Sequence, residues 1–318
     1  MSRANPNPPL YHGIVTALVT PLTEDLSLDE PALERLLERV IAGGIQGVLL
    51  LGTTGEAPSL PGEARRELLR AASRIIDGRV RTLAGVTAPC LTDTIGNAAD
   101  AAEAGIDGVL LMPPYYYHIG QAELEAWCRR VIDASPLPVM LYHMPGNTKV
   151  AFAAETIAAL AESPGVVGLK DSSGDTAYLR RNLAAVGPRR PDWSWLVGPD
   201  DFFVEALAWG VTGCTTVGAM LWPQAWAEVY EGHRLGHDAA AGAAQGALVE
   251  RMRSLYALTP GDGFVIRAVK AALSHAGVCD NRVAPPLLPC TGDAFRRIGE
   301  LLDAPDAADD NDATGTAS

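Results

Sequence analysis

The stretch GVVGLKDSSGD, residues 165–175, runs from an apolar segment through Lys170 into a polar loop. The apolar part carries valine and leucine without polar alternation, which is typical of a parallel strand buried on both faces. Asp175 is a residue type that favours the position just before a helix, and the segment AYLRRNLAAVG follows closely. The stretch therefore predicts one strand–loop–helix unit.

Seven further segments of this kind occur along the chain, with helical segments after nearly all of them. The predicted strands are residues 14–19, 46–51, 81–85, 107–112, 138–142, 165–170, 194–197 and 213–217. Eight successive strand–helix units predict an α/β protein with a (β/α)8 TIM barrel. A doubly wound sheet is the alternative, but it normally carries a glycine-rich phosphate loop, and the sequence has neither GxGxxG nor GxxxxGK[ST].

The patterns also predict the domain organisation. Residues 11–232 form the barrel, and the purely helical patterns beyond them indicate a small C-terminal helical extension over residues 233–303. The polar, proline-rich residues 1–10 and the acidic residues 304–318 have compositions typical of disordered ends.

Composition excludes several kinds of partner. A net charge of −13 disfavours nucleic acid, because phosphate binding needs a basic face. Apolar runs fall short of the ~20 residues that span a bilayer, so we expect no membrane association, and the first ten residues lack an apolar signal segment. The five cysteines are scattered without metal-ligand spacing, which predicts reduced thiols, no metal site and a cytoplasmic protein.

Lysine is rare in this chain. The 25 basic residues comprise twenty-two arginines and only Lys149, Lys170 and Lys270. An amine can lose its proton and attack a carbonyl carbon, which a guanidinium cannot do. Lys170 ends a predicted strand, and in TIM barrels the carboxyl ends of the strands carry the chemistry.

Other polar groups follow the strands at the same end of the predicted barrel. They are the turn GTTGE at residues 52–56, the segment PPYYYH at residues 113–118, Tyr142 with His143, and Thr215 with Thr216. Lys170 and these groups also have structural alternatives. The lysine could be a solvated charge, the tyrosines could pack under a loop, and the threonines of the turn could cap a helix. Their joint placement instead predicts one site.

A lysine beneath tyrosines is partly desolvated and therefore gives up its proton more readily, as Schiff-base formation with a keto acid requires. A tyrosine held by a threonine and a second tyrosine can relay the protons that the reaction moves. The small residues of the Gly52–Gly55 turn expose N–H groups and hydroxyls, which can hold the carboxylate of the keto acid without a cation.

Four motifs together resemble the dihydrodipicolinate synthase and N-acetylneuraminate lyase superfamily of class I, pyruvate-type aldolases. They are GTTGE after the second strand, PPYY after the fourth, Y-x-x-P after the fifth and G-x-K-[DE] on the sixth. The resemblance spans residues 12–300. It implies no cofactor or metal, a small-molecule 2-oxo acid and an aldehyde as partners, and a homotetramer built as a dimer of dimers.

The resemblance also implies the roles of individual residues. Lys170 forms the Schiff base with pyruvate, and Tyr142 is the general acid/base. Thr53 and Tyr116 complete the proton relay, with Tyr116 reaching into the site of a neighbouring subunit. Thr53 and Thr54 bind the keto-acid carboxylate, and the substrate-binding set further includes Gly52, Thr215, His143 and Asn147.

Asn147 departs from the synthase pattern, in which an arginine binds the carboxylate of aspartate semialdehyde. An amide cannot make that bidentate charge pair. The sequence therefore favours an aldolase that cleaves 4-hydroxy-2-oxoglutarate or a keto-deoxy sugar acid. The alternatives are 4-hydroxy-tetrahydrodipicolinate synthase, a keto-deoxy sugar-acid dehydratase, and a ligand-binding barrel without catalysis. His143 stands where asparagine is common and either contacts the substrate or supports the site from behind.

Overall fold

Eight parallel strands close into one barrel in the order in which they occur in the chain. In the computed structural model, which describes residues 9–304, β1 pairs with both β2 and β8. The strands are β1 (Gly13–Ala17), β2 (Gly47–Leu50), β3 (Arg81–Gly85), β4 (Gly108–Leu111), β5 (Val139–His143), β6 (Val166–Asp171), β7 (Ser194–Val197) and β8 (Gly213–Cys214). The predicted TIM barrel is confirmed. Residues 1–8 and 305–318, which carry most of the predicted disordered ends, lie outside the described residues.

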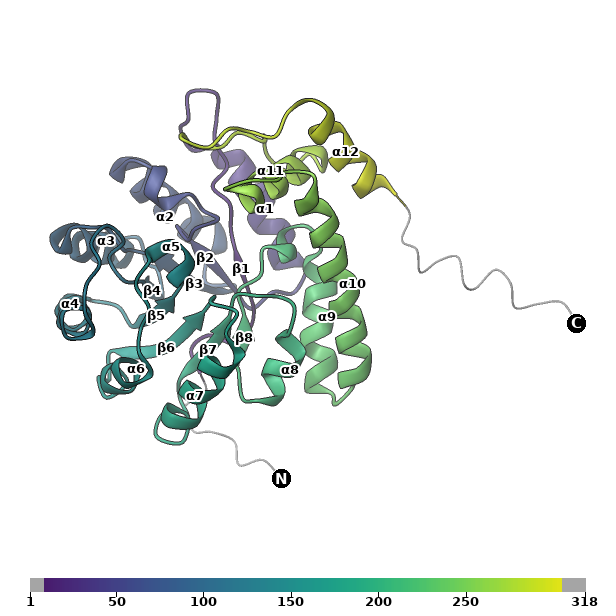
Figure 1. Ribbon diagram of the computed structural model, residues 1–318. Coiled ribbons are helices and arrows are strands. Elements are labelled where there is room, and N and C mark those ends of the chain that lie inside the picture. Colours follow the sequence, from purple (N-terminus) through teal and green to yellow (C-terminus); the bar gives the residue numbers. More distant parts are fainter. Residues whose placement is uncertain (1–8, 305–318) are drawn as a thin grey trace, which may run out of the picture.

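Helices surround the barrel (Figure 1). They are α1 (Glu30–Ala42), α2 (Gly62–Ile76), α3 (Leu91–Glu103), α4 (Gln121–Ala134), α5 (Pro145–Thr148), α6 (Ala154–Leu160), α7 (Thr176–Val186), α8 (Phe203–Ala208) and α9 (Pro223–Arg234), with short 3-10 turns η1 (Ala57–Ser59) and η2 (Gly218–Met220). Two helices begin at aspartate caps, and the one at Asp175 is the start that the sequence predicts. Asp29 accepts a hydrogen bond from the Ala32 N–H at 3.0 Å, and Asp175 accepts one from the Tyr178 N–H at 2.9 Å.

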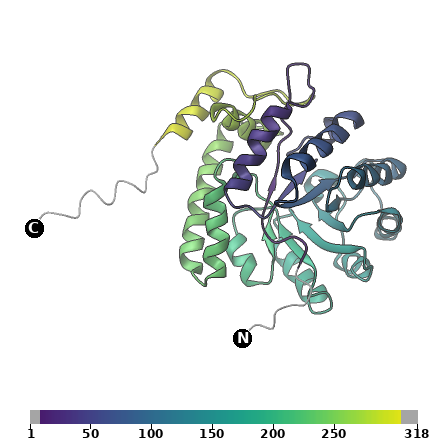
Figure 2. The same cartoon turned by 180° about the vertical axis from the view of Figure 1, so that it is seen from behind.

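The C-terminal helical extension comprises α10 (Asp238–Ala257), α11 (Phe264–His275) and α12 (Gly292–Asp303). Helices α9 and α10 lie side by side along one flank of the barrel, as both Figure 1 and Figure 2 show. Helix α11 packs against α10 and α12. The extension therefore continues the layer of helices beyond the last strand.

Two apolar layers stabilise the barrel. The larger lies between the strands and the helices, and a smaller one fills the barrel interior with Val15, Leu49, Leu83, Met140 and neighbouring side chains. Strand β6 approaches β7 so closely that a Cβ atom on Gly168 would lie 2.2 Å from the Ser194 carbonyl oxygen. The glycine of the G-x-K motif is therefore required by strand packing two residues before Lys170.

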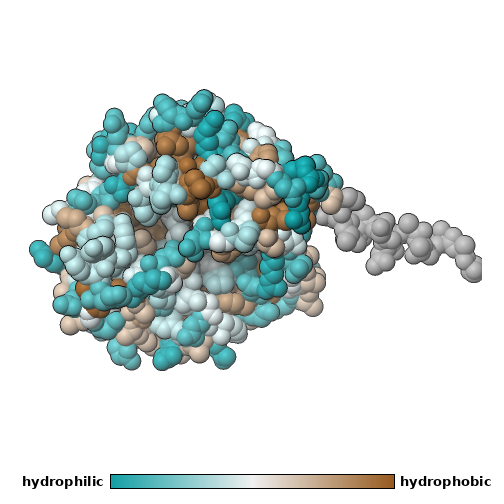
Figure 3. Space-filling model, turned by 45° about the horizontal axis from the view of Figure 1, so that its top comes forward, coloured by the Kyte–Doolittle hydropathy of each residue, from teal (hydrophilic) through white to brown (hydrophobic). Residues whose placement is uncertain are grey.

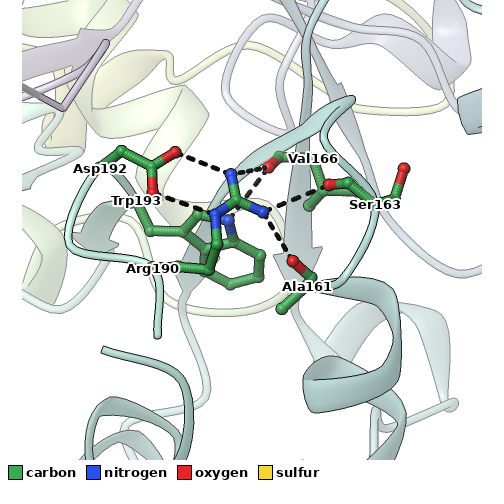
Figure 4. Close-up of polar contacts among 6 residues, drawn as sticks. All are labelled: Ala161, Ser163, Val166, Arg190, Asp192 and Trp193. Atoms are coloured by element: carbon green, nitrogen blue, oxygen red, sulfur yellow. Dashed lines mark hydrogen bonds and ion pairs between the residues drawn. The ribbon is translucent and has the colours of Figure 1, made fainter. Parts of the chain in front are cut away.

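Arg190 ties the start of β6 to the loop before β7 (Figure 4). Its guanidinium donates to the carbonyl oxygens of Ala161, Ser163 and Val166 at 2.6, 3.3 and 3.0 Å. It also pairs with Asp192 at 2.8 Å. These bonds satisfy carbonyl groups at the amino-terminal end of the strand that carries Lys170, on the side of the barrel opposite the predicted site.

The face shown in Figure 3 is largely hydrophilic, and its hydrophobic residues gather in small patches. Among residues 9–304, the most exposed large apolar side chains are Tyr116, Leu288, Tyr117 and Leu235. Within the same described range, no helix combines the length and the apolar character that a membrane crossing requires.

Candidate functional site

A cavity of about 540 Å³ opens at the carboxyl ends of the strands. It brings together most of the predicted site residues, which are scattered along the chain: Thr53, Thr54, Tyr142, Asn147, Lys170 and Thr215. Gly52 lines an adjoining cavity of about 350 Å³, which shares Thr53, Tyr142 and Asn147 with the larger one. These side chains therefore lie at one mouth of the barrel, while their roles stay predictions.

Lys170 and Tyr142 form the centre of the larger cavity. They are register partners on β6 and β5, and each is only 5% exposed. The Lys170 Nζ atom lies 4.2 Å from the centroid of the Tyr142 ring. Because both side chains point into the barrel interior, the amine and the phenol face the same small volume.

Hydrogen bonds and charge tune Tyr142. Burial raises the pKa of Tyr142. The neighbouring Lys170 charge and side-chain hydrogen bonds with Ser172, Thr53 and Lys170 lower it by more than burial raises it, so the net pKa lies below the usual value for tyrosine. A phenol with a lowered pKa exchanges its proton more readily near neutral pH. This environment suits Tyr142 for proton transfer.

The turn after β2 is held by its own backbone and by the segment that follows β1. The Glu56 N–H donates to the Thr53 carbonyl at 3.1 Å, and the Thr20 hydroxyl donates to the Gly55 carbonyl at 2.7 Å. Thr54 is buried, whereas Thr53 is exposed toward the cavity. The turn therefore presents the Thr53 hydroxyl on a fixed backbone.

The opposite wall contains an acidic residue that the sequence analysis did not single out. Asp200 Oδ2 accepts a hydrogen bond from the Thr216 hydroxyl at 2.9 Å, while Oδ1 is buried with no hydrogen-bond partner among the described residues. Burial raises the pKa of Asp200 to about 7 and Asp201 adds to the rise, against the lowering effect of the Thr216 bond. Asp200 follows β7 by three residues, and this position after a strand is the signal that would have identified it.

Thr215 lies next to this wall. Its side chain is 4% exposed, and its hydroxyl, like Asp200 Oδ1, lacks a partner within residues 9–304. Unpaired buried oxygens are costly unless a ligand or water satisfies them. This side of the cavity is therefore built to meet a polar group.

His143, which the sequence analysis included in the substrate-binding set, lines neither cavity, and its contact with substrate stays a prediction. Successive side chains on a strand point to opposite faces, and Tyr142 occupies the inward position. His143 instead stacks on the Tyr178 ring with centroids 4.2 Å apart, and its Nδ1 accepts a hydrogen bond from the Phe152 N–H at 3.3 Å. These contacts lie behind Tyr142, as the alternative of a supporting residue predicts.

Tyr116 also lines neither cavity within one chain. It is 77% exposed and packs edge-on against Tyr117, with ring centroids 5.1 Å apart. Tyr115, rather than Tyr116, lines the smaller cavity. A relay that includes Tyr116 therefore requires a second copy of the chain.

Comparison with known proteins identifies the family. The model of the dihydrodipicolinate synthetase family matches residues 10–304. The 4-hydroxy-tetrahydrodipicolinate synthase of Gluconacetobacter diazotrophicus is 32% identical over 295 residues, covering 92% of this chain and 96% of that protein. The synthase of Hyphomonas neptunium is 34% identical over 278 residues, covering 87% and 92%.

Solved structures agree. The dihydrodipicolinate synthase of Bacteroides thetaiotaomicron superimposes with a TM-score of 0.87 at 34% identity, over 92% of this chain and 98% of that one. An Escherichia coli prophage protein of the same family, solved in complex with pyruvate, gives a TM-score of 0.87 at 29% identity, over 92% and 98%. The curated relatives are synthases by name, which favours the synthase alternative over the aldolase interpretation that rests on Asn147. The chain is therefore an enzyme of the dihydrodipicolinate synthetase family.

Proposed function

We propose that the protein joins pyruvate to an aldehyde through a Schiff base on Lys170, and that aspartate semialdehyde is the aldehyde. One observation carries the proposal: the buried Lys170 amine lies beside the Tyr142 phenol in a cavity at the carboxyl ends of the strands. The names of the relatives support the acceptor. The complex of the Escherichia coli relative supports pyruvate as the first substrate.

The proposed chemistry uses Tyr142 as both acid and base. The Lys170 amine attacks the C2 carbonyl of pyruvate, and Tyr142 gives the resulting hydroxyl the proton with which it leaves as water. The Tyr142 phenolate then accepts a methyl proton, which gives an enamine whose carbon attacks the aldehyde. If the acceptor carries an amino group, that group then displaces Lys170 from the imine carbon and releases the product. If the acceptor carries none, water hydrolyses the imine and releases the product.

The Thr53–Thr54 turn is proposed to hold the pyruvate carboxylate through N–H groups and hydroxyls. The location of both threonines on the wall of the cavity that contains Lys170 supports this role. Gly52, which lines the adjoining cavity, belongs to the same turn. Thr53 also hydrogen-bonds Tyr142, so the turn links substrate binding to proton transfer.

Aldol cleavage of a hydroxylated 2-oxo acid is the second candidate. Asn147 lines the cavity where a synthase places an arginine, and Asp200 Oδ1 and the Thr215 hydroxyl have no partner within the described residues. An amide, a hydroxyl and a carboxyl bind hydroxyl groups well, whereas the carboxyl repels an acceptor carboxylate when ionised.

Two further properties are proposed. Tyr116 and Tyr117 expose adjacent aromatic rings, which supports an assembly of copies of this chain, as in a homotetramer. All five cysteines are free, which supports a cytoplasmic location. Light scattering of the purified protein measures the mass of the assembly, and a monomer at micromolar concentration would contradict the tetramer.

Borohydride trapping tests the Schiff base. The protein is incubated with pyruvate and borohydride, and the reduced adduct is mapped by mass spectrometry. The adduct is expected on the peptide that contains Lys170; an unmodified Lys170 refutes the mechanism. Steady-state rates with pyruvate and aspartate semialdehyde are then compared with cleavage of 4-hydroxy-2-oxoglutarate and with cleavage or dehydration of keto-deoxy sugar acids. Faster turnover of either acid ranks the second candidate or the dehydratase first.

A further inference from the structure

A buried ion pair joins the catalytic turn to the C-terminal extension. The Lys270 Nζ atom, on α11, lies 2.5 Å from Oε1 of Glu56, which ends the GTTGE motif. The two side chains are 0% and 1% exposed. Lys270 also donates to the Arg282 carbonyl at 2.5 Å, and Glu56 Oε2 accepts from the Ala284 N–H at 2.6 Å. The carboxylate is therefore held by two groups that both belong to the extension.

Glu56 is held in an unusual backbone conformation. Its φ of 58° and ψ of 26° lie in the left-handed region, which a glutamate adopts at a cost unless its surroundings fix it. From this position its N–H reaches back to the Thr53 carbonyl at 3.1 Å. The conformation of Glu56 thus closes the turn that presents Thr53 to the cavity.

The other end of the pair also touches the site. Ile266 precedes Lys270 by one helical turn on α11 and lines both cavities. A shift of α11 would therefore move one wall of the site, and the Glu56 turn would lose its anchor at the same time. The ion pair connects two walls that are more than 200 positions apart in the sequence.

Stability alone does not account for such a pair. Desolvation of two charges offsets most of their attraction, and apolar side chains of similar volume often stabilise a core equally well. What an ion pair adds is direction, because the carboxylate must face the ammonium and the Ala284 N–H together. We propose that Lys270 and Glu56 are positioning residues that fix the Thr53 hydroxyl against Tyr142.

The proposal rests on the proposed function for its kinetic consequence. Thr53 hydrogen-bonds Tyr142, and Tyr142 lies against the Lys170 amine. A displaced turn would weaken both the proton transfer and the grip on the pyruvate carboxylate. Misplacement of a catalytic group by about 1 Å can lower the rate by about 10²-fold.

Three variants and a control test the proposal. Lys270→Met removes the ammonium and keeps an apolar stem. Glu56→Gln keeps the shape and the bond from Ala284, and it carries the test if Lys270→Met does not accumulate in folded form. The double variant removes both charges. The control is His275→Ala, which removes a contact between α11 and α12, the 2.7 Å bond to the Phe295 carbonyl, at the other end of the same helix.

Two readouts separate positioning from mere stability. The first is hydrogen–deuterium exchange of the peptide 51–57, which needs no substrate. The second is kcat/KM with pyruvate per folded enzyme, well below each melting temperature. We expect exchange at the turn to rise about 10-fold or more in both single variants, while His275→Ala stays within about 2-fold of the wild type. We also expect kcat/KM to fall by about 10²-fold in both single variants and to stay low in the double variant.

Wild-type exchange at the turn in Lys270→Met and Glu56→Gln would overturn the proposal, even if their melting temperatures fall. Recovery of wild-type kcat/KM in the double variant would overturn it too, because charge balance alone would then suffice. A wild-type enzyme that traps no pyruvate refutes the proposed function instead, and the exchange data still decide whether the pair positions the turn.

Discussion

Tyr142 on β5 and Lys170 on β6 are register partners, and the amine lies 4.2 Å from the centre of the phenol ring. The next pair in the register, His143 and Asp171, points away from the barrel interior because side chains alternate along a strand. One step in register therefore separates Tyr142 and Lys170 from residues that pack against the helices. The contact between the amine and the phenol is a property of strand pairing rather than of loop conformation.

Replacing the amine tests the nucleophile directly. Lys170→Arg keeps a positive charge beside Tyr142 but cannot form an imine, so turnover and the borohydride adduct should both disappear. The melting temperature of Lys170→Arg should stay close to that of the wild type. Turnover close to that of the wild type in Lys170→Arg would assign the nucleophile to another group.

Removing the phenol hydroxyl tests the acid/base. Tyr142→Phe keeps the ring against Lys170 but has no exchangeable proton, so kcat should fall by about 10²–10⁴-fold. The adduct with pyruvate should still form, more slowly, because the amine remains. Rapid-quench measurement of adduct formation checks this, with Thr53→Val as a milder companion variant. An unchanged kcat would move the acid/base role to a different residue.

His143 should make the free energy of unfolding depend on pH. Burial lowers the pKa of His143 to about 4, with Asp175 acting in the opposite direction, and Nδ1 already accepts a hydrogen bond from the Phe152 N–H. Between the folded pKa of about 4 and the unfolded value of 6.5 the unfolded chain binds more protons. The contribution is therefore complete above the unfolded pKa and is lost as the pH falls, by about 2 kcal/mol at pH 5.

His143→Asn provides the comparison, because asparagine keeps an acceptor for the Phe152 N–H and does not titrate. Other groups titrate over the same range, so the measured quantity is the difference between the two proteins in urea midpoints at pH 7 and pH 5. The wild type should lose more stability than the variant. Parallel losses would mean that His143 is not buried in its neutral form.

Asn147→Arg should change the preference for the acceptor. The side chain lines both cavities, and a guanidinium there could pair bidentately with the carboxylate of aspartate semialdehyde. We expect KM for the semialdehyde to fall about 10-fold while KM for pyruvate is unchanged. Asn147→Lys, with a point charge instead of a fork, should give a smaller effect. Equal KM values in all three proteins would show that residue 147 does not meet the acceptor.

Arg190 should stabilise the fold without affecting catalysis. Arg190→Met leaves three carbonyl groups, between the end of α6 and the start of β6, without their charged donor and should cost about 3 kcal/mol of unfolding free energy. Its neighbour Arg189 is the matched control, because it is 54% exposed and lies 3.9 Å from Glu162. Arg189→Met should change stability by less than about 0.5 kcal/mol. Urea unfolding measures both, and a loss of kcat in folded Arg190→Met would contradict the purely structural role.

Local pattern was sufficient to predict most of the fold. Apolar runs located all eight strands to within a few residues, because parallel strands buried on both faces need continuous apolar sequence. Strand β8 is the exception: residues 213–217 were expected, but the strand is only Gly213–Cys214. Beyond Cys214 the chain leaves the regular strand, and the Thr216 hydroxyl bonds the side chain of Asp200 instead. That bond depends on a tertiary contact that no local pattern reveals.

The site was less predictable than the fold, because it too depends on tertiary contacts that local patterns do not reveal. Lys170 and Tyr142 could be identified because each ends a strand in a recognisable motif. The outward direction of His143 could not be predicted, because the phase of a strand, and not its location, decides which side chain faces inward. Asp200 was overlooked, since its significance comes from burial and from an oxygen without a partner among the described residues. Burial is a property of the assembled barrel.

The ion pair between Glu56 and Lys270 also limits where the chain can be divided. A chain cut after α9 would retain every strand and Lys170, yet it would leave the Glu56 carboxylate without the ammonium and the N–H group that face it. Transplanting the eight-stranded portion alone into a new protein would therefore import an unpaired carboxylate in the turn after β2. The portion of the chain that can be moved, shortened or permuted as one piece must include α11 and the segment that carries Ala284.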